Sequence, residues 1–427
     1  MSKKDQALLE EEYESSPVPV HARKGLLSVS LVWVGFPMIM TGTVTGATIV
    51  SGLGFIKGML AILLGNLILF AYVGILGYLS TKKGYNFSMQ ASITFGKKGS
   101  ILVSGLLSTL VIGWFAVQTG LTGSSMHSAF GSSTFAITLL AGILYILVTI
   151  IGVKALTYIG AISAPFFFII GLWGVNDAIS RTDWTSILQF NGSGALSFGV
   201  AVTMVVALFA DSGTMAADFN RWSRNAKESV WATFTAFPVS NMIAMVFGGL
   251  ITAAALSDTS SDFFQYIASK GGAVSILAVI LLFLNLGSVC SHCLYNASVG
   301  WSNLLHKKMR KTALVIGAIG TVLALSGAWN HFIDWLSLLG IIVPPIGAVI
   351  IVDQIIYRKN ADITDSMRTK PFVAWGLGAL GGLLVEFWAP YLSTAFISLL
   401  TAGIFYWVFM MMESRQTAEI ESRMSEG

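Results

Sequence analysis

The sequence predicts an all-α integral membrane protein with about twelve transmembrane helices. Of its 427 residues, 55% are hydrophobic and only 11% are charged, whereas soluble domains carry about 25% charged residues. Apolar stretches of about 20 residues, the length that crosses about 30 Å of hydrocarbon, recur along nearly the whole chain. The net charge of +4 does not indicate a nucleic-acid partner, because the basic residues lie in short loops.

The predicted spans follow one another with short polar connections. They lie near residues 27–50, 54–79, 100–127, 134–152, 154–176, 197–217, 229–256, 273–302, 312–327, 332–357, 372–389 and 393–412. We expect residues 1–26 and 413–427 to form polar cytoplasmic tails, residues 27–357 a ten-helix core, and residues 358–412 two accessory transmembrane helices.

Basic residues are unevenly distributed between the predicted loops. If the N-terminus is placed in the cytoplasm, all but three of the 25 Lys and Arg residues fall on the cytoplasmic side. The exceptions are Lys57, Arg181 and Lys270. Because cytoplasmic loops carry an excess of basic residues, this asymmetry predicts an even number of spans with both termini in the cytoplasm.

Two of the predicted helices carry helix-breaking residues near mid-membrane. The first contains Gly35 and Pro37 in "VWVGFPMIMTG", and the sixth contains Asp211-Ser212-Gly213 in "ADSGT". Proline removes a backbone donor and glycine loosens the chain, so we expect breaks at these residues. Breaks five helices apart predict two inverted five-helix halves with a transporter's binding site between them. Ordinary kinking of membrane helices is the alternative.

The third predicted helix, "LVIGWFAVQTG", carries Trp114 and Gln118 on one face, because they are four residues apart. An indole stacks on a flat ring and an amide both donates and accepts hydrogen bonds, so the pair suits a polar heterocycle. Phe209, Asp211 and Ser212 of the sixth helix are expected to complete this pocket. The alternative is that Trp114 and Gln118 only pack within the bundle.

Asp211 needs a physical explanation, because an ionised acid at the centre of a bilayer costs about 2.5–3.5 kcal/mol. An unwound segment beside a water-accessible cavity would tolerate it. There the carboxyl would accept hydrogen bonds from donors of a substrate, or carry a proton. Alternatively, Asp211 caps backbone N–H groups that the helix break leaves free.

A cation site is predicted where the first and eighth helices meet. A break after Gly35 would free the backbone carbonyls of Gly35 and Met38, and the eighth helix supplies Asn285, Ser288 and Ser291 at intervals of three. Carbonyl and hydroxyl oxygens are hard ligands that suit a small cation. Asn285 is also a candidate substrate-binding residue. Interhelical hydrogen bonding by small polar residues is the alternative.

Nearly the whole chain resembles the nucleobase:cation symporter-1 family, also called the purine/cytosine permease family, and most closely its bacterial cytosine permease branch. The segments that carry the resemblance are "PVPVHARKGLLSV", "FGKKGS", "GWF", "GTMAADFNRWSRNAK", "LYNASVGWSN" and "PPIGAVIIVDQ". The resemblance implies a leucine-transporter-like fold of two inverted five-helix repeats plus two C-terminal helices. It also implies sodium-coupled import of a nucleobase or related heterocycle by alternating access across the inner membrane.

The resemblance also assigns roles to residues. It implies that Trp114 and Phe209 are the stacking aromatics and that Gln118 contacts the substrate. The implied sodium ligands are Gly35, Met38, Asn285 and Ser288. We further expect a monomer in membrane lipid, without a cofactor. No nucleophile–base pair, paired acids or metal cluster stands out in the sequence, so no enzymatic activity is expected.

Three positions depart from the cytosine-permease pattern. Val111 stands in place of a glutamine on the third helix, and Asp211 in place of a serine on the sixth. Val289 follows Ser288 where the pattern has a second hydroxyl residue. Cation coupling would therefore be weakened, would use Ser291 instead, or would pass to protons through Asp211. The alternatives are a proton-coupled transporter of a hydroxymethylpyrimidine-type thiamine precursor or purine base, or an uncoupled facilitator.

Overall fold

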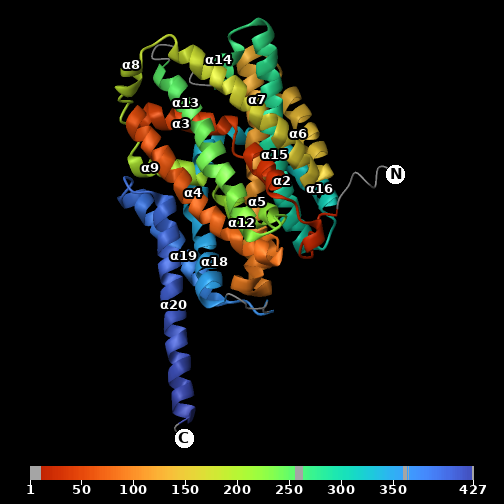
Figure 1. Ribbon diagram of the computed structural model, residues 1–427, viewed down its shortest axis with the longest axis vertical. Helices are drawn as coiled ribbons and strands as arrows, with labels where there is room; N and C mark the ends of the chain where they lie inside the picture. Colours follow the sequence, from red (N-terminus) through yellow and green to blue (C-terminus); the bar gives the residue numbers. More distant parts are fainter. Residues whose placement is uncertain (1–10, 255–262, 359–362, 364, 426–427) are drawn as a thin grey trace, which may run out of the picture.

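The computed structural model describes residues 11–254, 263–358, 363 and 365–425, which fold into a bundle of helices (Figure 1). This part of the chain contains no β-strand, only an isolated bridge between Lys24 and Ser223. The C-terminal helix α20 (Thr394–Ser425) runs well beyond the bundle at the bottom of Figure 1. The all-α class predicted from the sequence is confirmed.

The other helices pack side by side in the bundle, most of them running along it. In chain order they are η1 (Val20–Ala22), α2 (Leu26–Gly35), α3 (Met40–Leu53), α4 (Phe55–Lys83), α5 (Phe87–Phe130), α6 (Thr134–Ile151), α7 (Val153–Ile179), α8 (Trp184–Leu188), α9 (Phe198–Ala207), α10 (Ala210–Thr214), α11 (Ala217–Asn220), α12 (Ala226–Phe234), η2 (Thr235–Asn241), α13 (Met242–Ala254), α14 (Phe263–Ala268), α15 (Gly272–Leu305), α16 (Met309–Leu325), η3 (Ala328–His331), α17 (Phe332–Ile342), α18 (Pro344–Val352), η4 (Asp353–Tyr357) and α19 (Thr369–Trp388).

Among the described residues, nine helices are long and apolar enough to cross a membrane, and the bent pair α2–α3 makes a tenth. The sixth and ninth predicted spans correspond to shorter helices, α9 of 10 residues followed by breaks and α16 of 17 residues. The structure therefore confirms a helical protein with many spans, while the number of twelve spans stays a prediction.

The outer surface of the bundle is apolar, as a lipid-facing surface must be. On α4, Leu60, Leu64 and Leu67 are 54%, 43% and 46% exposed, whereas Asn66 of the same helix is fully buried. The Asn66 amide bonds the Ile62 carbonyl oxygen at 2.9 Å, and its own oxygen accepts from Asn241 at 2.9 Å. Because polar groups in a bilayer must be satisfied inside the protein, this arrangement fits a multi-pass membrane protein.

The predicted break of the first span is confirmed, and that of the sixth is displaced. The axes of α2 and α3 differ by 57° across residues 36–39. In the sixth span, however, the break lies at Leu208 and Phe209, and Asp211-Ser212-Gly213 form most of the short helix α10. The prediction that these three residues are unwound is wrong, because short polar residues also suit the first turn of a helix.

Close packing of helices depends on glycine in the first half of the chain. A Cβ atom added at Gly35 of α2 would collide with Gly160 of α7, and one at Gly160 would collide with the Leu31 carbonyl oxygen. These two glycines therefore allow α2 and α7 to approach closely.

The long helix α5 is divided at Gly96, which takes a φ of 75°. The predicted third span, 100–127, lies in the part of α5 after Gly96. The helical segment before Gly96 was not predicted.

The described part of the N-terminal tail is built into the bundle. The Glu12 carboxylate accepts hydrogen bonds from the Val153 N–H at the start of α7, at 3.1 Å, and from the Tyr295 hydroxyl on α15, at 2.8 Å. The Arg221 guanidinium, just after α11, donates to the carbonyl oxygens of Glu12 and Tyr13, both at 2.8 Å. This N-terminal strap, Glu11 to Lys24, therefore ties three separate parts of the core together.

Candidate functional site

The third-helix residues predicted to bind substrate lie in the interior. Trp114 is 3% exposed and Gln118 is fully buried on α5. The Trp114 ring meets Phe332, at the start of α17, edge to face at 5.9 Å. The Gln118 amide donates to the Thr41 hydroxyl on α3 at 3.0 Å, just beyond the break of the first span. The two side chains thus link α5 to two different segments.

The sixth-helix residues lie beside the same break. Phe209 is the residue before α10, and its ring packs on Phe36 at 5.3 Å. The Asp211 carboxylate accepts a hydrogen bond from the Ser212 backbone N–H at 2.7 Å, as an acid in the first turn of a helix does. The Trp114 side chain lies within interaction distance of this carboxyl. The structure therefore brings Trp114, Phe209, Asp211 and Ser212 into one region.

Three buried polar atoms in this region have no hydrogen-bond partner within the described ranges. They are the Trp114 Nε1, the Gln118 Oε1 and the Asp211 Oδ2. The Trp114 N–H and the Asp211 carboxylate lie near each other, but neither atom has a hydrogen bond of ordinary geometry. A buried polar atom left unpaired costs about 1–3 kcal/mol, so a ligand or water between them would stabilise the site. Together they offer one donor and two acceptors, from α5 and α10. A small polar molecule with the complementary pattern would satisfy all three.

The four predicted cation ligands are also brought together. The Asn285 amide on α15 donates to the Met38 carbonyl oxygen at 2.6 Å and accepts from the Met40 N–H at 2.8 Å. The Ser288 hydroxyl donates to the Gly35 carbonyl oxygen at 2.6 Å. Asn285 and Ser288 thus hold the two sides of the break between α2 and α3. Such bonds between helices are what we expect if these small polar residues only link the helices, which is the alternative to a cation site.

The oxygen atoms at this break also fit a small hard cation. They comprise two backbone carbonyls, one hydroxyl and one amide oxygen, which carry no net charge and suit a monovalent ion. Ser291 does not join them, because its hydroxyl faces the Tyr145 carbonyl oxygen on α6 at 3.4 Å. Val289 offers no oxygen. A cation here would be held by Gly35, Met38, Asn285 and Ser288. It would replace the hydrogen bonds that Asn285 and Ser288 now donate to the Met38 and Gly35 carbonyl oxygens.

Several neighbours of the site escaped the sequence analysis. His292 stacks on Phe36 at 4.9 Å, and its Nδ1 lies 2.7 Å from the Ser288 carbonyl oxygen. Cys293 lies next to the side chains of Asp211 and Ser212. Among the described residues, no group of three or more His, Cys, Asp and Glu side chains could hold a metal ion. The eight-residue stretch "WNHFIDWL", rich in aromatics, was the available signal for Phe332.

Comparison with known proteins shows which family the chain belongs to. A family model described as "Permease for cytosine/purines, uracil, thiamine, allantoin" matches residues 17–375. The chain belongs to this family. Similar proteins include the cytosine permease of Escherichia coli (strain K12), which is 32% identical over 381 residues, covering 88% of this permease and 89% of that relative.

Solved structures similar to the permease confirm its fold. Mhp1, a nucleobase-cation-symport-1 family transporter in a closed conformation with bromovinylhydantoin bound, has a TM-score of 0.80 at 17% identity, over 96% of both chains. A Na+-coupled sialic acid symporter, substrate-bound and outward-open, has a TM-score of 0.70 at 12% identity, over 95% of the permease and 92% of that chain. The leucine-transporter-like fold is therefore confirmed. Membership of the permease family indicates that the protein is a multi-pass membrane transporter.

Proposed function

We propose that the permease is a secondary active symporter that imports a nucleobase or related nitrogen heterocycle, similar to cytosine, with sodium, by alternating access. The observation that carries this proposal is the set of three unpaired buried atoms on Trp114, Gln118 and Asp211. It is supported by the 32% identity to a cytosine permease and by the fold shared with a transporter that has bromovinylhydantoin bound.

The donor and acceptor pattern favours an aminopyrimidine edge. The Trp114 N–H would donate to a ring acceptor, while the Gln118 oxygen and the Asp211 carboxylate would accept from a ring N–H and an exocyclic amino group. Phe209 would cover one face of the ring by aromatic contact. Ser212 would orient Asp211 through its backbone N–H. Asn285 has both ends of its amide engaged at the α2–α3 break, so its part in substrate binding would be indirect.

Sodium coupling would act through the break of the first span. Binding of the ion by Gly35, Met38, Asn285 and Ser288 would replace the direct bonds between α15 and the ends of α2 and α3. The angle between α2 and α3 would then depend on the ion. The same two short helices adjoin the substrate region through Phe36 and Thr41. Ion and substrate binding would therefore favour the same arrangement, which is the requirement for coupled transport.

A second candidate function rests on Asp211. An acid with one unpaired oxygen can carry the coupling proton itself, and Val289 removes an oxygen from the cation site. This favours a proton-coupled transporter of a hydroxymethylpyrimidine-type thiamine precursor or a purine base as the alternative to sodium symport. An uncoupled facilitator is the third possibility.

The proposal is tested with purified permease in liposomes. We expect radiolabelled cytosine to accumulate above its external concentration only when a sodium gradient is imposed, and a sodium ionophore to abolish the accumulation. Collapse with a protonophore alone, and competition by hydroxymethylpyrimidine or purines, would favour the proton-coupled alternative. Equilibration without accumulation in every gradient would contradict symport.

The orientation belongs to the same proposal. We place the permease in the inner membrane as a monomer, with both termini in the cytoplasm, because all but three of its 25 basic residues then face the cytoplasm. No bound cofactor is proposed, since the described chemistry needs only the substrate and a coupling ion.

A further inference from the structure

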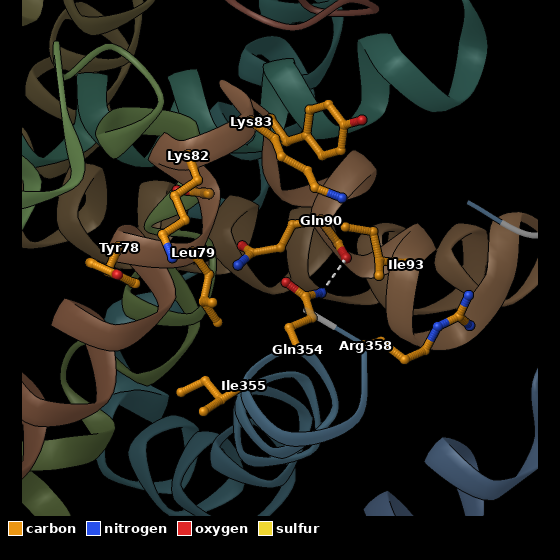
Figure 2. A pocket seen from close by; sticks show the side chains of 11 residues that line it. Tyr78, Leu79, Lys82, Lys83, Gln90, Ile93, Gln354, Ile355 and Arg358 are labelled. Atoms are coloured by element: carbon orange, nitrogen blue, oxygen red, sulfur yellow. Dashed lines mark hydrogen bonds between the residues drawn. The ribbon is translucent and has the colours of Figure 1, made fainter. Parts of the chain in front are cut away.

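We infer that a basic cavity at the predicted cytoplasmic end of the bundle binds the headgroup of an anionic phospholipid. The cavity has a volume of about 610 Å³ and lies where the end of α4, the start of α5 and the segment η4 meet (Figure 2). Its lining residues are Tyr78, Leu79, Ser80, Lys82, Lys83, Tyr85, Gln90, Ile93, Gln354, Ile355 and Arg358. None of the candidate transport residues belongs to it.

The cavity is positively charged. Lys82 and Lys83 from α4 and Arg358 after η4 contribute to its walls, and no acidic side chain lies among the described residues that line it. The nearest carboxylate in sequence, Asp353, is paired with Arg368 at 3.0 Å and does not neutralise the cavity. Basic pockets between membrane helices on the cytoplasmic side are suited to anionic lipid headgroups.

Aromatic rings position the two lysines. The Lys82 ammonium lies over the Tyr78 ring at 4.4 Å, and the Lys83 ammonium lies 5.7 Å from the centre of the Tyr85 ring. A cation over an aromatic face keeps its charge. Both ammonium groups therefore add positive charge to the cavity. Figure 2 shows both lysines descending from the same helix end toward the cavity.

The inner wall of the cavity is neutral and polar. Gln354 donates to the Gln90 carbonyl oxygen at 2.9 Å, the dashed line in Figure 2, and to the Thr94 hydroxyl at 3.1 Å. The Gln90 Oε1 is buried and has no partner among the described residues. An unpaired acceptor beside cations suits a ligand that combines a phosphate with a hydroxyl donor. Phosphatidylglycerol has this chemistry, since its headgroup joins a phosphodiester to free hydroxyls.

The rim favours a lipid over a free phosphate. Tyr78 is 39% exposed and Ile355 is 38% exposed, and the neighbouring Ile356 is 52% exposed. In Figure 2, Tyr78 and Ile355 lie on the side of the cavity away from Arg358. These side chains continue the lipid-facing surface of the bundle, where acyl chains would lie. A soluble phosphate would gain nothing from this apolar rim.

The test uses native mass spectrometry of the full-length permease in detergent, titrated with phosphatidylglycerol or phosphatidylcholine. We expect selective retention of one phosphatidylglycerol. The variant Lys82→Gln/Lys83→Gln should bind it at least tenfold more weakly, since each basic residue near an anionic lipid contributes about fivefold. The matched control, Lys97→Gln/Lys98→Gln, changes two cytoplasmic-side lysines outside the cavity and should bind as the wild type does.

Three results would overturn the inference: equal retention of the two lipids, unchanged binding by the Lys82→Gln/Lys83→Gln variant, or displacement of the lipid by millimolar inorganic phosphate, which would indicate a free anion site. If the double variant does not fold, the single Lys82→Gln variant replaces it, with about fivefold weaker binding expected. Because the readout is lipid binding, its failure is distinguishable from a failure of the proposed transport.

Discussion

Asp211 has one carboxylate oxygen bonded to the Ser212 N–H and the other without a partner in the described part of the chain. In Asp211→Asn, the first bond can persist, but an N–H donor can replace the unpaired oxygen. We therefore expect uptake to fall by about tenfold to a hundredfold, the effect of losing a hydrogen bond to a charged group, or the substrate range to change. The measurement is uptake of a panel of bases.

The control for this variant is Asp334→Asn, which alters an exposed acid at the start of α17. It should transport as the wild type does. Both proteins should melt at similar temperatures, because Asn keeps the size of Asp. Unaltered kinetics and substrate range in Asp211→Asn would contradict a substrate or proton role for this residue.

Ser288 and Ser291 lie one turn apart on α15 but face different partners. The Ser288 hydroxyl bonds the Gly35 carbonyl oxygen, and the Ser291 hydroxyl faces the Tyr145 carbonyl oxygen. We expect Ser288→Ala to raise the sodium concentration for half-maximal uptake, by about fivefold for a lost oxygen ligand of modest strength. Ser291→Ala is the matched control. Equal sodium dependence in both variants would contradict the proposed ion site.

At the scale of single residues, two kinds of neighbour could be predicted from the sequence. They are residues on one face of the same helix, and residues in motifs that resemble those of a family. The spacing of Trp114 and Gln118 placed them on one face, and the resemblance indicated the Gly35–Ser288 neighbourhood. It did not indicate that Phe332 would meet Trp114, or that His292 would stack on Phe36. Those contacts depend on packing between segments far apart in the chain, which spacing within one helix does not determine.

Among the elements, the α2–α3 break was predictable and the α9–α10 break only approximately so. Proline and glycine have a fixed cost inside a helix, so Gly35 and Pro37 mark the first break directly. An acid is instead favourable in the first turn of a helix, and in the sixth span Asp211 lies in the first turn of α10, which begins at Ala210 after the break at Leu208 and Phe209. The short segments of α5 before Gly96, α8 and α14 carry no transmembrane-length apolar signal and were missed.

The α2–α7 contact gives a test of element packing. In Gly160→Ala, the added methyl group would collide with the Leu31 carbonyl oxygen. We expect the free energy of unfolding to fall by about 1–3 kcal/mol, as overpacking usually causes, measured by thermal unfolding in detergent. Gly376→Ala on α19, where an added Cβ meets nothing within 4 Å, should be neutral or stabilising by up to about 1 kcal/mol. Similar losses in both would contradict the close approach.

At the scale of the whole molecule, the N-terminal strap joins parts of the bundle that are far apart in the sequence. The 1–26 tail was predicted as a polar tail, but Glu12 is 2% exposed. A run of charged residues usually indicates a solvated segment, and nothing local distinguishes Glu12 from exposed Glu11. Its partners Val153, Tyr295 and Arg221 come from distant parts of the chain, so this arrangement was not predictable.

Burial raises the pKa of the Glu12 carboxyl, and the bonds from Tyr295 and Val153 and the charge of Arg221 offset this only in part. The native state therefore keeps a proton that the unfolded chain has already lost at pH values just above the ordinary carboxyl pKa of about 4.3. Stability should fall as pH rises through that window. Glu12→Gln has no proton to lose, so the wild type should lose stability relative to it as pH rises.

Thermal unfolding of the two proteins across the window measures the difference. Glu11→Gln, which changes the exposed neighbour, should follow the wild-type curve. Parallel curves for the wild type and Glu12→Gln would contradict a raised pKa of the buried Glu12 carboxyl.

The Arg368 guanidinium is one of several groups that anchor the two C-terminal helices to the core. The Trp375 N–H also donates to the Ile342 carbonyl oxygen at 2.8 Å, and the Ser398 hydroxyl donates to the Gly340 carbonyl oxygen at 3.2 Å. Arg368, just before α19, donates to the carboxylate of Asp353, the first residue of η4, at 3.0 Å, to the Tyr406 hydroxyl on α20 at 3.0 Å, and to the Thr94 carbonyl oxygen in α5 at 2.7 Å. The Tyr406 hydroxyl also donates to the Asp353 carboxylate at 2.5 Å. Deleting everything after the tenth span would thus leave this fully buried carboxylate without either Arg368 or Tyr406. A shortened ten-helix version of this transporter would need that acid replaced by a neutral side chain before it could be expected to assemble.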